Sequence, residues 1–242
     1  LGVCIGFPAI LDPDAAAIVS YAAMDIQQPT SFAQVFPAFW REVELPVYLE
    51  NDANLACEGE AFLRRGAGGA ANMLYLSIGS GCGGAVRLDG KLRRGARCRA
   101  GEVGAMLLQP ALGAPGRSAA RETLEDAVCL AALERRFGAA LRDGAQPGEA
   151  SAQAMRDYLC GPLSGAVYSL VMTLDVELCV LAGIVPGALG MQLCTQVSEA
   201  LRAALPESTP VRVEPSVSAD AGVIGAAATV FERSLDALLG SG

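Results

Sequence analysis

Hydrophobic runs alternate along the chain with segments of helical periodicity. Short apolar runs at residues 46–50, 72–78 and 178–182 are bounded by polar or glycine residues and predict buried strands. Residues 51–65 and 124–137 space their apolar side chains as helices do. Strands that alternate with helices are typical of the α/β class. The remaining predicted strands are 1–8, 85–88, 91–93 and 211–213, and the remaining predicted helices are 32–40, 150–159, 162–174, 189–205 and 218–239.

Turn residues divide this pattern into two parts. Gly66-Ala67-Gly68-Gly69 closes a predicted helix and is the best candidate for a domain boundary. Asp89-Gly90 is a tight-turn dipeptide between two short strands, which predicts a hairpin and therefore a mixed sheet. We predict two lobes, residues 1–69 and 70–242, the second with the hairpin and a closing helix of small residues. Because the chain starts inside a predicted core strand, we expect the first lobe to be incomplete.

The composition narrows the possible chemistry. The 242 residues are 52% hydrophobic and 18% charged, which excludes a disordered segment. The chain has no His, so it has no imidazole base, no Ser-His or Cys-His nucleophile and no His-ligated zinc or haem. A net charge of −8 argues against this chain binding nucleic acid by itself. The basic pairs Arg64-Arg65 and Arg93-Arg94 are typical of solvated turns.

Cysteine usage and hydropathy bear on location. The eight cysteines are dispersed and mostly lie in apolar stretches, as reduced cytosolic thiols do, so we expect a cytoplasmic protein. The most apolar stretch, residues 169–191, contains Asp175, Glu177 and Pro186. It therefore predicts a buried helix and strand, and we expect no association with a membrane.

Glu50-Asn51-Asp52-Ala53-Asn54 lies where a predicted strand passes into a helix. One interpretation is that Asn51 or Asp52 caps the helix by accepting backbone N–H groups. The other is that the Asp52 carboxylate faces the ligand crevice at the carboxyl end of a strand and accepts a proton from a substrate hydroxyl. In that case Asn51 would hydrogen-bond a neighbouring hydroxyl. The residues alone leave both interpretations open.

Two glycine-rich segments follow. Residues 79–84, Gly-Ser-Gly-Cys-Gly-Gly, contain more glycines than a hairpin needs, and glycines let a backbone approach a phosphate and point N–H groups at it. The segment matches neither a Walker loop nor a dinucleotide loop. Gly101-Glu102-Val103-Gly104 is either a turn with a solvated Glu or a carboxylate presented to sugar hydroxyls.

In this order and spacing the three segments resemble the ROK family, which comprises repressors, open reading frames and sugar kinases of the actin-like ATPase superfamily. Residues 50–54 match its E-N-D-A-N run and are followed by Gly59-Glu60; residues 78–85 match its I-G-T-G-x-G-G-G phosphate loop; residues 101–104 match G-E-[IL]-G, with Ala105 where His belongs. Softer matches are residues 123–125 to C-L-E, 180–183 to V-L-G-G and 219–227 to an alanine-rich closing helix. The resemblance implies an actin-like, ribonuclease H-like two-lobe fold with mixed sheets.

The resemblance also implies roles for single residues. Asp52 would be the general base on a sugar hydroxyl. The other hydroxyls would be bound by side chains at Asn51, Glu102 and Glu125. A nucleotide phosphate site, if one is retained, would be lined by Gly79, Ser80, Gly81 and Gly83. ATP and Mg²⁺ would be cofactors only of a kinase.

Three departures from the family pattern bear on the function. The sequence has no D-x-G-G-T hairpin; Ala105 and residues 117–123 stand where zinc ligands belong, so we expect no zinc; and the glycine pair on the adenosine side is reduced to Gly183. These departures favour the sugar-sensing effector domain of a ROK-type transcriptional regulator. Its ligand, a sugar or sugar phosphate, would bind between the lobes at Asn51, Asp52, Glu102 and Glu125.

This interpretation has further implications and alternatives. DNA would be bound only through a helix-turn-helix that this chain does not contain, and the protein would form a homodimer. The alternative is an ATP-dependent sugar kinase with the same pocket and Asp52 as the base. A catalytically inactive scaffold is the third possibility.

Overall fold

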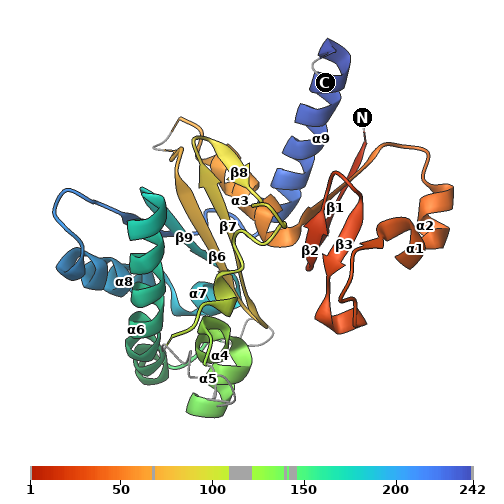
Figure 1. Ribbon diagram of the computed structural model, residues 1–242. Coiled ribbons are helices and arrows are strands. Elements are labelled where there is room, and N and C mark those ends of the chain that lie inside the picture. The colour runs from red at the N-terminus through yellow and green to blue at the C-terminus, as the bar shows by residue number, and fades with distance from the viewer. Residues whose placement is uncertain (1, 67–68, 109–121, 139–140, 142–145, 241–242) are drawn as a thin grey trace, which may run out of the picture. The chain divides into compact units, whose positions relative to one another are not determined.

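The computed structural model describes residues 2–66, 69–108, 122–138, 141 and 146–240 (Figure 1). Leu1, residues 67–68 of the predicted boundary and residues 117–121 of the counterpart of the zinc loop lie outside the described residues. The chain divides into two compact units. Unit 1 consists of Leu1–Gly69, Leu92–Ala100 and Val217–Gly242, and unit 2 of Ala70–Lys91 and Gly101–Ser216.

Unit 2 is built on a five-stranded mixed sheet with the order β10-β9-β6-β7-β8. β6 and β7 form the predicted antiparallel hairpin, whereas β9 pairs with β6, and β10 with β9, in parallel. The carboxyl ends of the adjacent strands β6 and β9 therefore lie at one edge, where open α/β sheets bind ligands. The strand bounds are β6 Met73–Ile78, β7 Cys82–Leu88, β8 Lys91–Arg93, β9 Leu178–Ala182 and β10 Arg212–Pro215.

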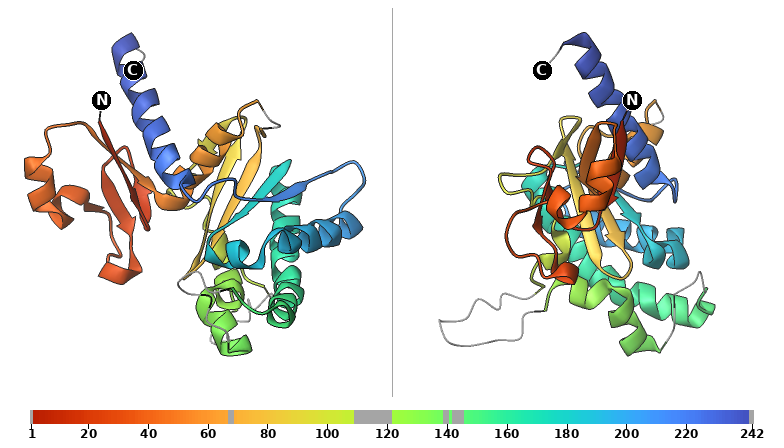
Figure 2. Two further views of the ribbon diagram at one scale, coloured as in Figure 1. Left: turned by 180° about the vertical axis from the view of Figure 1, so that it is seen from behind. Right: turned by 90° about the vertical axis from the view of Figure 1, so that its right-hand side faces the viewer.

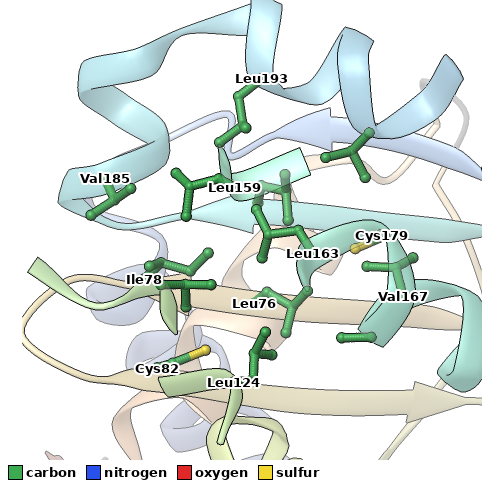
Figure 3. Packing of buried hydrophobic residues seen from close by; sticks show 14 of the residues in the cluster. Leu76, Ile78, Cys82, Leu124, Leu159, Leu163, Val167, Cys179, Val185 and Leu193 are labelled. Atoms are coloured by element: carbon green, nitrogen blue, oxygen red, sulfur yellow. The ribbon is translucent and has the colours of Figure 1, made fainter. Parts of the chain in front are cut away.

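Helices pack on this sheet around one large apolar core (Figure 3). β6 and β9 are buried on both faces and carry almost continuous apolar runs, as parallel central strands do. Leu159, Leu163 and Val167 of one long helix, α6, are fully buried in the core. The helices of unit 2 are η2 Val103–Ala105, α4 Leu124–Val128, α5 Leu130–Phe137, α6 Glu149–Leu174, α7 Ile184–Leu189 and α8 Met191–Ala204.

Unit 1 contains the parallel pair β1 and β5 and a separate three-stranded antiparallel sheet, β2-β3-β4. Aromatic rings fill its small core: Phe7 contacts the rings of Tyr21, Phe32 and Phe36 edge to face. The element bounds are β1 Val3–Phe7, β2 Ile10–Asp12, β3 Ala17–Ser20, η1 Ala22–Met24, β4 Thr30–Ser31, α1 Phe32–Val35, α2 Pro37–Glu42 and β5 Val47–Asn51.

Helices α3 (Asp52–Leu63) and α9 (Ala221–Leu239) pack against each other more extensively than any other pair of elements (Figures 1 and 2). Glycines allow this close approach: a Cβ on Gly225 would lie 1.8 Å from the Leu55 carbonyl oxygen, and one on Gly59 would lie 1.8 Å from that of Ala221. The closing helix thus belongs to the unit that contains residues 1–69, not to a lobe formed by residues 70–242. The segment Leu92–Ala100 departs from the predicted division in the same way.

Several predicted boundaries also need correction. β7 begins at Cys82 and not at residue 85, because Gly83 and Gly84 pair with Ser77 and Leu76 of β6. The predicted helices 150–159 and 162–174 are the single helix α6, which continues through Pro162. Residues 32–40 form two short helices that divide at Pro37. The sequence pattern missed β2, β3 and β4 because each is only two to four residues long.

Within the described ranges, no helix combines the length and the hydropathy that crossing a bilayer requires.

Candidate functional site

Asn51 and Asp52 lie where β5 passes into α3, and the two residues have different roles. Asn51 is the N-cap: its Oδ1 accepts the N–H groups of Ala53 (2.9 Å) and Asn54 (3.2 Å), and its Nδ2 donates to the Ala9 carbonyl (3.1 Å). The capping interpretation therefore holds for Asn51. Asp52 is the first residue of the helix and is exposed; its Oδ1 accepts the N–H of Ala53. With the cap supplied by Asn51, one oxygen of the Asp52 carboxylate faces solvent at a strand end.

Glu50, one residue earlier, organises a buried polar network that the sequence analysis did not assign. Its Oε1 accepts the Asn54 Nδ2 (2.8 Å) and the Asn51 backbone N–H (3.0 Å), and its Oε2 pairs with Arg94 at 2.7 Å from Nε and 2.5 Å from Nη2. The Glu50 side chain is only 5% exposed, so Arg94 supplies the charge partner that a buried carboxylate needs. The prediction that Arg93-Arg94 is a solvated turn is therefore wrong for Arg94.

Glu60, two turns along α3, is a second buried carboxylate. It is fully buried, pairs with Arg64 Nε at 2.9 Å and accepts the Val217 N–H at 2.9 Å. Val217 is the first residue of the segment that leads into α9. Arg64 is itself buried, so the prediction that Arg64-Arg65 is a solvated turn is wrong for Arg64. Glu60 thus fixes the start of the closing segment to the helix that carries Asp52.

In unit 2, the glycine segment forms a tight loop between β6 and β7. The Gly79 N–H donates to the Gly81 carbonyl (2.9 Å), and the Gly79 carbonyl accepts the Leu130 N–H (2.8 Å). Gly83 lies in β7 opposite Ser77 and not in the loop. The loop itself therefore consists of Gly79, Ser80 and Gly81, while Gly83, the second residue of β7, stays a predicted phosphate ligand.

Glu125 contacts this loop directly. Its Oε2 accepts the Cys82 N–H at 2.8 Å, and a Cβ on Gly81 would lie 2.8 Å from the same oxygen, so a larger residue at this position would displace the carboxylate. Glu125 is otherwise exposed. Burial, reinforced by the Glu125 carboxylate and by Cys129, raises the pKa of the Cys82 thiol to about 12. Cys82 is therefore a neutral, buried thiol and not a nucleophile.

Glu102 reaches the same sheet edge through close backbone packing. Gly101 has φ +96° and its Cβ position lies 2.5 Å from the Gly84 carbonyl, while a Cβ on Gly104 would lie 2.1 Å from the Cys82 carbonyl. The glycines on both sides of Glu102 thus press this segment onto β7, and Glu102 and Ala105 are exposed. Ala105 offers no polar side chain where the resembled family has His. Gly183, the glycine of the 180–183 match, follows β9 with φ +94°, and its Cβ position lies 2.4 Å from the Ile78 carbonyl oxygen.

The loop fits a nucleotide phosphate in part. Of its N–H groups, Gly79 and Cys82 already have acceptors, which leaves those of Ser80 and Gly81 as candidate phosphate donors. The space at Gly79 is open, since a Cβ there would meet no atom within 4 Å. The Glu125 carboxylate beside the loop opposes an anion. In the part of the chain that the structure describes, no group of three or more Cys, Asp or Glu side chains is arranged to hold a metal ion.

A cavity of about 650 Å³ in unit 2 is a separate feature. It lies between residues 106–108, Glu122, Ala127 and the face of α6 from Tyr158 to Ser169. Neither Glu102 nor Glu125 is among its lining residues. The structure thus places Asn51 and Asp52 at one strand end of unit 1, and Glu125 and the glycine loop in contact within unit 2.

Comparison with known proteins gives the chain a family context. A sequence model of the ROK family matches residues 1–233. The chain is 34% identical to a glucokinase of Halalkalibacterium halodurans over 140 residues, which are 55% of this chain and 40% of that protein. It is 35% identical to a xylose repressor of Caldicellulosiruptor bescii over 104 residues, 43% of this chain and 25% of that protein. The matched parts thus span less than half of these two relatives.

Among solved structures, the ROK hexokinase of Thermus thermophilus is similar over 96% of this chain and 78% of its own, with a TM-score of 0.71 and 28% identity. The mixed sheets described above are therefore those of the actin-like α/β fold.

Proposed function

The chain belongs to the ROK family, and from that premise we propose that the protein is an ATP-dependent sugar kinase in which Asp52 is the general base. The observation that carries the proposal is the exposed Asp52 carboxylate at the end of β5, where Asn51 has taken over the cap. Because the Asn51 side chain already caps α3, the helix does not need Asp52 as its cap. The sequence alone favoured the regulator; we place the kinase first, because the glucokinase match covers 55% of the chain and the xylose repressor match 43%.

In the proposed mechanism, a sugar hydroxyl would donate a hydrogen bond to the free Asp52 oxygen and pass its proton there, while the hydroxyl oxygen bonds to the γ-phosphorus of ATP and the bond from that phosphorus to ADP breaks. ATP, with Mg²⁺, would supply the phosphoryl group. Asn51 is held rigid by three hydrogen bonds and would orient a neighbouring hydroxyl through its remaining amide hydrogen. Glu102 and Glu125 would bind other hydroxyls, and the N–H groups of Ser80 and Gly81 would receive a phosphate, with Gly79 and Gly83 flanking them.

Release of ADP by the full-length protein over a panel of sugars tests the proposal. Asp52→Asn should lower kcat by at least ~100-fold, the usual contribution of a general base, and leave sugar-induced thermal stabilisation in place. Asp236→Asn, which changes an exposed carboxylate on α9, is the matched control and should leave kcat unchanged. Full turnover by Asp52→Asn would refute the assignment of the base.

A second candidate function is the sugar-sensing half of a transcriptional regulator. Two observations favour it. Glu125 accepts the Cys82 N–H next to the glycine loop, so this N–H is not available to a phosphate. Ala105 lacks the polar side chain of the family motif. In this case sugars would raise the melting temperature of the protein but no sugar would cause ADP release. DNA binding would then depend on a helix-turn-helix outside this chain.

Two further properties are part of the proposal. We place the protein in the cytoplasm, because all eight cysteines are free thiols in the structure. We also propose a homodimer, which light scattering on the full-length protein tests.

A further inference from the structure

The segment Leu92–Ala100 concentrates positive charge in an acidic protein. Arg93, Arg94, Arg97 and Arg99 lie within seven residues, although the whole chain has 18 Lys and Arg and a net charge of −8. The segment packs with unit 1, the unit that contains Asn51 and Asp52, and it runs directly into Gly101-Glu102. The segment therefore brings a local positive charge to the unit that contains the proposed base.

The segment is a curled loop with its own hydrogen bonds. Gly95 has φ +76° and Cys98 has φ +54°, a left-handed conformation that a cysteine rarely adopts. The Ala100 N–H donates to the Arg94 carbonyl at 3.0 Å, and the Cys98 N–H to the Gly95 carbonyl at 3.4 Å. Because these bonds close the loop on itself, the residues between Arg94 and Ala100 are held on a fixed turn.

One arginine anchors the loop. Arg94 pairs with the buried Glu50 through Nε and Nη2, and Glu50 also accepts the backbone N–H of Asn51. The loop is thereby tied to the end of β5, two residues before Asp52. Because Arg94 is paired with Glu50, it is not available to bind a ligand.

The other two arginines of the turn have no such role. Arg97 and Arg99 are exposed, and across the described parts of the chain neither forms an ion pair with an acidic side chain. The carboxylates whose charges act on Cys98 of this turn are Asp12, Glu50 and Asp14, of which Glu50 is paired with Arg94. Asp12 already accepts the N–H groups of Asp14 and Ala15 in its own turn. Two unpaired guanidinium groups on a fixed turn are suited to an oxyanion, which a guanidinium binds through two parallel hydrogen bonds.

We infer that Arg97 and Arg99 bind an oxyanion carried by the sugar ligand, so that the protein acts on a sugar with a carboxylate or phosphate group. This inference rests on the proposed sugar site at Asn51 and Asp52. The anchored loop would hold the charged end of the sugar while Asp52 faces a hydroxyl. A neutral sugar would lack this contact and bind more weakly.

Isothermal titration of the full-length protein with glucose, glucuronate and glucose 6-phosphate tests the inference. We expect the anionic sugars to bind more tightly than glucose, and Arg97→Gln/Arg99→Gln to weaken them about tenfold or more while glucose is unaffected. Raising the salt concentration from about 50 to about 300 mM should weaken only the anionic ligands. Arg202→Gln, an exposed arginine on α8, is the matched control and should change nothing.

Three results would overturn the inference, and only the third would also overturn the proposed function. If glucose binds as tightly as the anionic sugars and the double variant binds all three normally, the loop has no role and the sugar site stands. If the double variant weakens only a non-hydrolysable ATP analogue, the arginines serve the nucleotide instead. If the wild-type protein binds no sugar and Asp52→Asn does not change ADP release, both the inference and the proposed function are wrong.

Discussion

The crossing of α3 and α9 at Gly59 and Gly225 makes a sharp prediction about stability. Gly225→Ala would place a Cβ 1.8 Å from the Leu55 carbonyl oxygen and 2.9 Å from the Gly59 nitrogen. Ordinary van der Waals contact begins near 3.4 Å, so the two helices would have to separate by about 1.6 Å at this point. Both obstructing atoms belong to the backbone of α3, so no side-chain rotation can relieve the clash.

The expected cost follows from this geometry. Overpacking a closely packed interface costs about 1–3 kcal/mol, and a clash with backbone belongs at the upper end. Alanine recovers less than about 1 kcal/mol of helix propensity. We therefore expect Gly225→Ala to lower the free energy of unfolding by about 2–3 kcal/mol, which for a chain of this size is a fall in Tm of roughly 4–12 °C.

Thermal and urea denaturation of the variants is the assay. Gly222→Ala is the matched control: it lies in the same helix, a Cβ there meets no atom within 4 Å, and its Tm should be unchanged or slightly raised. Gly59→Ala should destabilise as Gly225→Ala does, and the double variant should cost less than the two single variants together, because one displacement relieves both clashes. A Tm for Gly225→Ala within about 2 °C of the wild-type value would refute the reasoning.

Three further predictions concern single side chains. Glu60→Gln should lower the free energy of unfolding measured in urea by about 3 kcal/mol, because it removes the buried carboxylate that pairs with Arg64; a loss below about 0.5 kcal/mol would contradict this. Thr123→Ala should cost about 1 kcal/mol by removing the capping box of α4. Hydrogen bonds from Thr123 lower the pKa of Asp126, so the stabilisation is present above the ordinary carboxyl pKa and is lost as the pH falls through the folded-state value; a Thr123→Ala defect of equal size at pH 7 and pH 2 would argue against it. Cys82 should resist thiol reagents at pH 8 in the native protein and react after unfolding, as mass spectrometry of labelled peptides can show.

The regular elements were predictable wherever periodicity and length were sufficient. The strands at 46–50, 72–78 and 178–182 are found within one residue of their predicted bounds, because each is apolar and ends at a polar or glycine residue. The boundary errors have local causes. Gly83 and Gly84 suggested a loop, yet they pair with β6 as part of β7. Position 84 needs glycine for a different reason: a Cβ there would lie 2.7 Å from the Val103 side chain and 3.0 Å from the Gly101 carbonyl oxygen.

The sequence was sufficient to identify candidate site residues but not the contacts that these residues make. The E-N-D-A-N run identified Asn51 and Asp52, and the structure separates their roles into cap and free carboxylate. The Glu50–Arg94 pair could not be predicted, since its two residues are 44 positions apart and a pair of adjacent arginines is usually solvated. The contact between Glu125 and Cys82 could not be predicted for the same reason, because the two residues are 43 positions apart and only the fold brings them together.

The position of Asp52 depends on a helix that the chain reaches only at its end. β5 pairs in parallel with β1 and leads into α3, and β10 pairs in parallel with β9 and is followed in the chain by α9. These two helices then pack on each other, with Gly59 and Gly225 at the contact and Glu60 holding Val217 at its margin. A larger residue at either glycine would therefore displace the helix whose first residue is the proposed base. This contact explains why α9 has glycine at position 225. Gly225→Ala should consequently weaken sugar binding as well as folding, whereas Gly222→Ala should affect neither.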